Sequence, residues 1–180
     1  MLVVGSTALR QHVPSTRHPK DLDIICTIEE ADEYVRSLGH VDSIRKDEYC
    51  YHIVKDRKSI ELFLAREGSA LMDYLYMYDD ILEYAPLNVL YSMKLSHIHY
   101  PTKMHRFEKH VRDLCVIHEM VGGMDVLKDI TQKLVVETEA RLGKIRTPKL
   151  TKSSKDFFEQ SKNRVVSVFI HDSIHRAMAR

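Results

Sequence analysis

Two aspartates near the start of the chain are the residues best suited to chemistry. Asp21 and Asp23 are one residue apart and lead into the apolar run Ile24-Ile25-Cys26. Residues i and i+2 of a strand share a face, so a strand here places both carboxylates side by side. Mg²⁺, which prefers oxygen ligands, relieves the repulsion of such a pair. The alternative is a turn in which Asp21 caps a backbone N–H, but Asp23 lies within the apolar run.

A glycine-serine turn precedes the aspartates. Gly5-Ser6 follows an apolar run at 2–4 and comes well before Pro14. We expect a strand over 2–4 and then a short helix that is capped by Ser6 or Thr7. The start of a helix offers backbone N–H groups and a hydroxyl to an anion. A phosphate at this turn and a cation at the aspartates are the basic requirements of phosphoryl or nucleotidyl transfer.

These two motifs resemble those of the nucleotidyltransferase superfamily, whose fold DNA polymerase β, aminoglycoside nucleotidyltransferases and CCA-adding enzymes share. The chain is most similar to the AbiEii-type toxins and related small nucleotidyltransferase-like proteins. The resemblance implies transfer of a nucleoside monophosphate from a nucleoside triphosphate to an acceptor hydroxyl. It also implies Mg²⁺, or Mn²⁺ in its place, on Asp21 and Asp23, with the phosphates at Gly5 and Ser6.

Three later residues match further positions of that family. Glu61 stands where the family usually has a third aspartate, and the resemblance implies a metal ligand or general base. Lys94 is implied as a cation that neutralises the triphosphate, and Asp113 as a group that orients Lys94 or a substrate hydroxyl. The residues alone allow other interpretations. Glu61 could be a surface residue of a half-exposed strand, Lys94 could snorkel, and Asp113 could pair with Lys109 on one helix.

The order of periodic segments predicts an α+β fold. Strand-like runs come early and helical runs come late, with Pro86, Pro101 and Gly122-Gly123 as breaks. We predict a nucleotidyltransferase-like mixed-sheet lobe over residues 1–82 and a helical lobe over residues 83–180. Within the first lobe we expect strands over 2–4, 21–27, 49–54 and 58–65, a hairpin turn over 55–57 and a helix over 29–38.

Composition limits the class of protein. The net charge is +1, so no strong overall field indicates a nucleic-acid binder. Three cysteines without C-x-x-C spacing favour a reducing compartment. No apolar run approaches the roughly 20 residues that span a bilayer, and the first residues lack the pattern of a leader. We therefore predict a cytoplasmic protein without a membrane partner.

Several segments carry weaker signals. The basic segment 141–155 could contact RNA phosphates, although a solvated connection is the default. The aromatic run 74–78 could stack a nucleobase, although core packing is commoner. His171 and His175 lack a third ligand for zinc. A protein side chain, a tRNA end and a small molecule stay open as acceptors, and so do the base of the nucleotide and the oligomeric state.

Overall fold

The computed structural model describes residues 1–78, 81, 83–97, 109–110, 113–114, 116–117, 120 and 128–142. Two compact units divide the chain, the first covering Met1–Leu90 and the second beginning at Tyr91. The named elements are β1 (Leu2–Val4), α1 (Gly5–His12), β2 (Asp21–Cys26), α2 (Ile28–Leu38), β3 (Ser43–Lys46), β4 (Cys50–Lys55), β5 (Lys58–Leu64), α3 (Ala70–Tyr78), α4 (Leu87–His97) and α6 (Lys128–Leu142). The predicted α+β class is confirmed.

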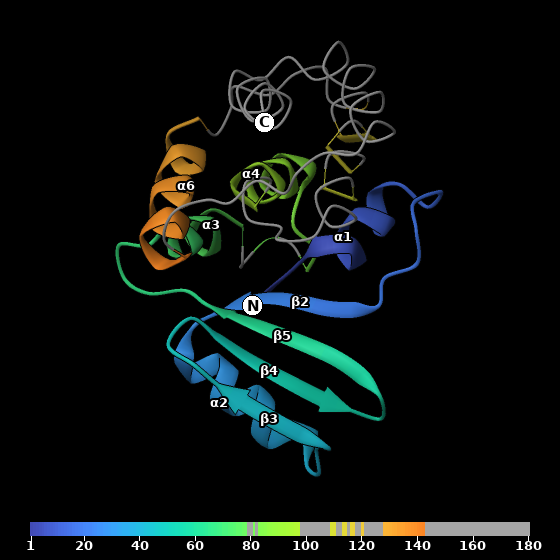
Figure 1. The fold of residues 1–180 in the computed structure, drawn as a ribbon. Helices are drawn as coiled ribbons and strands as arrows, with labels where there is room; N and C mark the ends of the chain where they lie inside the picture. The colour runs from blue at the N-terminus through green and yellow to red at the C-terminus, as the bar shows by residue number, and fades with distance from the viewer. Residues whose placement is uncertain are drawn as a thin grey trace, which may run out of the picture. The chain divides into compact units, whose positions relative to one another are not determined.

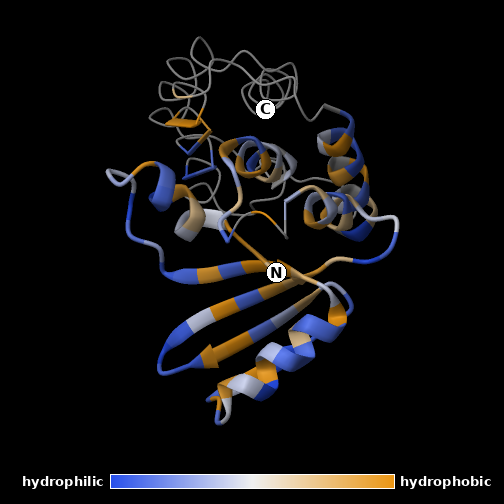
Figure 2. Ribbon diagram, turned by 180° about the vertical axis from the view of Figure 1, so that it is seen from behind, coloured by the Kyte–Doolittle hydropathy of each residue, from blue (hydrophilic) through white to orange (hydrophobic). Residues whose placement is uncertain are grey.

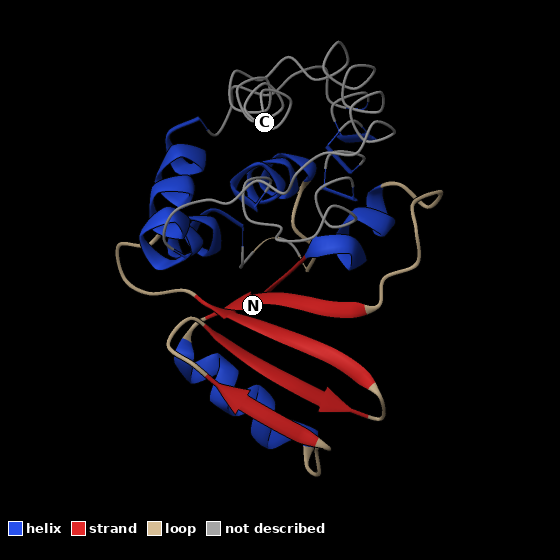
Figure 3. Cartoon of the chain, viewed as in Figure 1, coloured by secondary structure: helices blue, strands red, loops and turns tan. Residues whose placement is uncertain are grey.

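The first unit is built on a five-stranded mixed sheet with the order β1-β2-β5-β4-β3. β2 and β5 run parallel, and the other neighbouring strands are antiparallel (Figure 3). The parallel pair requires a long crossover, which here contains α2 and the strands β3 and β4. The edge formed by β1 is covered, because the Val3 N–H donates to the Glu83 carbonyl and the Ala85 N–H donates to the Val3 carbonyl.

α2 covers one face of this sheet (Figure 1). The helix begins at a capping box in which Thr27 Oγ1 accepts the Glu30 N–H and the Glu30 carboxylate accepts the Thr27 N–H. Figure 2 shows hydrophobic and hydrophilic residues alternating in colour along the strands. The apolar set under α2 is Ile24, Cys26, Tyr51, Ile53, Ile60, Leu62 and Leu64 with Ala31 of the helix.

The opposite face is apolar beside β1 and along one row that continues from Ile25 to Phe63 in β5 and Cys50 in β4. Leu2, Val4 and Ile25 have no exposed surface, and α1 and α3 both contact β2. This second cluster packs α1 against β1 and β2. The other residues of β2, β5 and β4 on this face include the polar ones described below. β3, which the sequence did not predict, is exposed along its whole length.

Candidate active site

Asp21 and Asp23 lie on the face of the sheet opposite α2. Within β2, Leu22, Ile24 and Cys26 face the core under α2, so the residues that alternate with them, including both aspartates, face the other side. Both aspartates are half-buried. Asp23 is the register partner of Val4 in β1 and of Glu61 in β5. The two carboxylates therefore share one face, as their spacing predicts, and Asp23 is the one aligned with a further acid.

Gly5 is in direct contact with the Asp23 carboxylate. A Cβ atom built on Gly5 would lie 1.9 Å from Asp23 Oδ2 and 2.8 Å from its Cγ. Gly5 also has a φ of 64°, in the left-handed region that favours glycine. The Thr7 hydroxyl donates to the Asp21 carbonyl at 3.1 Å, and Ser6 is buried. The first turn of α1 is thus held against the two aspartates of β2.

The predicted cap of this helix is wrong. The N-cap residue is Val4, and no side chain caps the helix, so neither Ser6 nor Thr7 has that role. The reason is that Gly5 adopts a positive φ and lets the helix begin directly after β1. Ser6 and Thr7 instead lie within the first turn, beside β2.

Gly5→Ala is expected to lower the free energy of unfolding by about 2–4 kcal/mol, because a left-handed alanine and displacement of the Asp23 side chain both cost free energy. Urea denaturation of the full chain measures the change. Gly68→Ala is the matched control: Gly68 has a φ of 76° with no atom within 4 Å of its added Cβ. Equal losses in the two variants would show that the contact with Asp23 contributes nothing.

A row of polar side chains crosses the sheet from Asp23. In β5 the register partner of Asp23 is Glu61, and in β4 the partner of Glu61 is His52. His52 is in turn paired with Arg45 of β3. Residues in register share a face, so the predicted third acid does lie on the same face as Asp21 and Asp23. Acid, acid, imidazole and guanidinium therefore follow one another across four strands.

His52 lies between two carboxylates. Its Nδ1 is 3.4 Å from Glu61 Oε1, and its Nε2 is 3.5 Å from Asp47 Oδ2. The His52 and Glu61 side chains each keep about a third of their surface exposed. His52 can therefore hold the Glu61 carboxylate on the β4 side of the row while remaining in reach of solvent.

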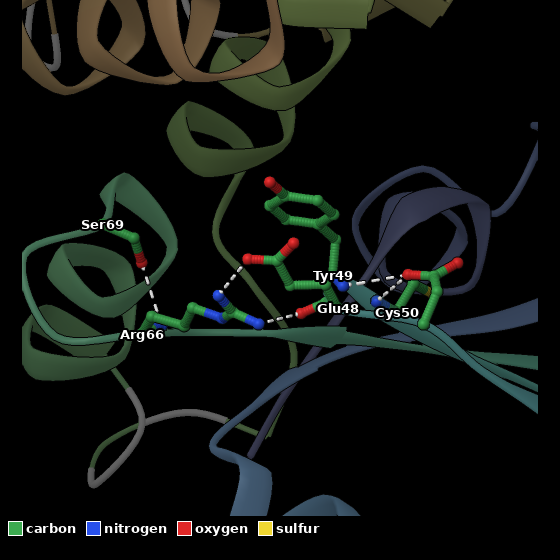
Figure 4. Close-up of polar contacts among 6 residues, drawn as sticks. Glu48, Tyr49, Cys50, Arg66 and Ser69 are labelled. Atoms are coloured by element: carbon green, nitrogen blue, oxygen red, sulfur yellow. Dashed lines mark hydrogen bonds and ion pairs between the residues drawn. The ribbon is translucent and has the colours of Figure 1, made fainter. Parts of the chain in front are cut away.

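Asp47 is fixed by the turn between β3 and β4. Its Oδ1 accepts the N–H groups of Tyr49 and Cys50, each at 2.9 Å. The same turn is tied to the end of β5, because Arg66 Nη1 lies 2.6 Å from Glu48 Oε1 (Figure 4). The backbone N–H of Tyr49, then that of Cys50 and the nearby charges of His52 and Arg45, lower the pKa of Asp47 below 3.8.

The lowered pKa makes Asp47 a source of pH-dependent stability. A carboxylate whose folded-state pKa is depressed stabilises the fold above its unfolded pKa, and the contribution is lost as pH falls through the folded pKa. Asp47 is 47% exposed, so we expect Asp47→Asn to cost only a few tenths of a kcal/mol at neutral pH. Urea denaturation should show this deficit narrowing below about pH 4. Glu33→Gln, at an exposed acid, is the control. A loss of stability in Asp47→Asn that does not change with pH would contradict a lowered pKa of Asp47.

Sequence reasoning missed His52 and Asp47. His52 was missed because the predicted turn over 55–57 is one residue too long, and a turn of that length would place Tyr51 opposite Glu61. In the structure Lys55 pairs with Lys58 around a two-residue turn, which places His52 there. Asp47 had no comparable signal. Its position depends on β3, whose exposed residues carry no apolar alternation.

The acids fit a cation that arrives with a phosphate ligand. Among the residues that the structure describes, no group of three or more His, Cys, Asp or Glu side chains is placed to hold a metal. Mg²⁺ usually takes one or two protein carboxylates and fills its other positions with water and substrate phosphates. Asp23, with Asp21 on the same strand face and Glu61 in register, supplies such a partial set.

Lys94 and Asp113 belong to the second unit and form a buried ion pair there. Lys94 Nζ is 2.9 Å from Asp113 Oδ2, and each side chain is 8% exposed. Asp113 thus contacts the very lysine that the resemblance implies it orients. Burial of both charges makes this pair costly to break from either side.

Other predicted features fall partly or wholly outside the described residues. Of the basic segment 141–155, only Arg141 and Leu142, at the end of α6, are described. His171 and His175 lie outside the described residues. The aromatic run is divided, since Tyr74 and Leu75 are buried while Tyr76 is exposed. None of the described helices has the length and apolarity that crossing a bilayer requires.

Comparison with known families identifies one match. A family described as a domain of unknown function (DUF7277) matches residues 1–159. The chain belongs to the DUF7277 family. The DUF7277 match spans the whole sheet, α1, α2 and all seven predicted site residues, including Lys94 and Asp113. No curated protein and no solved structure matches the chain.

Proposed function

We propose that this DUF7277 protein is a Mg²⁺-dependent nucleotidyltransferase on a nucleotidyltransferase-like fold. A nucleoside triphosphate would bind with its outer phosphates at Gly5 and Ser6, beside the carboxylates of Asp21 and Asp23. An acceptor hydroxyl oxygen then bonds to the α-phosphorus, the bond from that phosphorus to the bridging oxygen breaks, and pyrophosphate leaves. The hydroxyl proton passes to a base, for which Glu61 is the candidate. A bound Mg²⁺ would supply neutralisation of the phosphate charge.

The contact between Gly5 and Asp23 carries this proposal. The helix that starts at Gly5 has no side-chain cap, and this contact places its first turn beside the carboxylate pair. Asp23 Oδ2 occupies the space that a Cβ on Gly5 would need. A helix start favours anions and a carboxylate pair favours cations, so a ligand that carries both charges would be held by both features at this place. A metal-bound polyphosphate is the ligand that presents both.

Transfer of label tests the proposal directly. The full-length protein, Mg²⁺ and each α-³²P-labelled nucleoside triphosphate are incubated with a cell lysate that serves as a source of acceptors. We expect label on a protein, an RNA or a small molecule, together with release of unlabelled pyrophosphate. Label that stays on the free triphosphate with every nucleotide, at both Mg²⁺ and Mn²⁺, would overturn the enzymatic proposal.

A second candidate function is nucleotide binding without catalysis, as in a regulatory protein. The observation that favours it is the contact of Glu61 Oε1 with His52 Nδ1 at 3.4 Å, which engages the third acid on the side away from Asp23. Calorimetry distinguishes the two functions. Metal-dependent binding of a triphosphate with no label transferred would support the binding function, and turnover would exclude it.

A further inference from the structure

A cavity opens at the end of the sheet where β2 and β5 begin and β4 ends. Its volume is about 370 Å³, within the range of ligand pockets in proteins. Its lining combines three apolar residues with three lysines: Pro19, Leu22, Ile60, Lys20, Lys55 and Lys58. Such a lining suits a ligand that has a negative charge at one end and an apolar body.

This cavity is separate from the row of acids. Leu22 and Ile60 pack against the core under α2, so the cavity reaches the α2 side of the sheet. Lys55 Nζ donates to the carbonyl of Leu38, the last residue of α2, which holds that ammonium on the same side. Asp21 also lines the cavity, but within β2 its side chain alternates with Leu22 toward the opposite face.

The positive charges of the three lysines in the lining lie close together and repel one another. Lys55 and Lys58 are register partners at the end of the β4–β5 hairpin, and like charges directly opposite destabilise an antiparallel pair. The two turn residues between them, Asp56 and Arg57, have φ of 51° and 63°, which fixes a tight hairpin. Lys20 adds a third positive charge immediately before β2. Besides Asp21, the lining contains one acid, Asp56.

We infer that this cavity is a binding site for a phosphate-bearing ligand of about mononucleotide size. The ammonium groups neutralise the phosphate, and Pro19, Leu22 and Ile60 contact its organic part. A bound phosphate relieves the repulsion between Lys55 and Lys58, so binding and hairpin stability support each other. The ligand is a free mononucleotide or the terminal nucleotide of an RNA strand. The site adjoins the proposed nucleotidyl-transfer site at Asp21, but Lys55 and Lys58 lie on the α2 side of the sheet, and phosphate binding to them needs no metal.

Calorimetry on the full-length protein tests the inference, with 5′-AMP and a 5′-phosphorylated single-stranded RNA hexamer as probes. EDTA prevents metal-dependent binding at the acids, and low salt reduces the screening of the attraction between the lysines and the phosphate. We expect binding that the double variant Lys20→Gln, Lys58→Gln weakens about tenfold. Both residues are exposed, so the fold should be retained, and circular dichroism checks this. Arg45→Gln is the control, since it removes a positive charge from the opposite face.

The two probes separate the two sources of phosphate. Similar affinity for 5′-AMP and the hexamer supports a free mononucleotide, and binding of the hexamer alone supports an RNA terminus. Absence of binding by both probes would overturn the inference, and so would equal weakening by the lysine variants and by Arg45→Gln. These outcomes leave the label-transfer result unchanged, because that assay depends on Mg²⁺ at the other face.

Discussion

The double substitution Asp21→Asn, Asp23→Asn is expected to lower nucleotidyl transfer about a thousandfold while changing the free energy of unfolding by no more than about 1 kcal/mol. Asparagine keeps the size of each side chain and removes the charge that would hold a cation. Both aspartates are half-buried on one face, and asparagine is large enough to keep the contact with Gly5, so the substitution mainly removes the repulsion between the two charges.

The single variants should not be equivalent. Asp23 abuts Gly5 and is in register with Glu61, whereas Asp21 is in register with Ser59. We therefore expect Asp23→Asn to reduce transfer more than Asp21→Asn. Transfer of label from an α-labelled triphosphate measures the rate, and urea denaturation measures stability.

Asp32→Asn is the control for these variants. Asp32 lies on α2, which covers the other face of the sheet, and it pairs with Lys46 at 2.6 Å. The same chemical change there should leave transfer intact. Unfolding of the double variant would make Asp21 and Asp23 structural residues, and full activity in it would remove the metal site from the proposal.

The elements with strong local signals could be predicted from the sequence. β2 follows from alternation around Asp21 and Asp23, and α2 follows from the apolar residues of one helical face with Thr27 and Glu30 as its capping box. The hairpin of β4 and β5 follows from two strand-like runs with a short turn between them. Each of these features is decided by neighbours in the sequence.

The features that depend on distant residues were missed. β3 is a strand only because it pairs with β4, since all of its residues are exposed. The start of α1 depends on the positive φ of Gly5. Gly5 packs against the Asp23 carboxylate, which is 18 residues away in the sequence. A capping rule considers only the residues next to the helix start, such as Ser6 and Thr7, and so cannot predict that contact. The sequence therefore predicts the acids and the shared face of Asp21 and Asp23, but not the contact of Asp23 with Gly5.

Breaking the buried pair of Lys94 and Asp113 is the second large expected effect. Asp113→Asn should lower the free energy of unfolding by about 3–5 kcal/mol, because it leaves the Lys94 ammonium uncompensated at 8% exposure. The exposed pair of Lys46 and Asp32 joins the same two residue types at 2.6 Å, with side chains 45% and 40% exposed. Asp32→Asn should cost far less than Asp113→Asn, because solvent screens the exposed pair. Equal costs, measured by urea denaturation, would contradict the importance of burial.

Replacing Lys94 and Asp113 together tests whether Lys94 has a structural or a functional role. Lys94→Met with Asp113→Leu removes both charges and fills their volume, so it should recover most of the stability lost in Asp113→Asn. If the pair serves only the second unit, this stable variant keeps nucleotidyl transfer. If Lys94 neutralises the triphosphate, as the resemblance implies, transfer is lost although the protein stays folded. Because the stability and the label transfer are read on one variant, a loss of activity there cannot be attributed to unfolding.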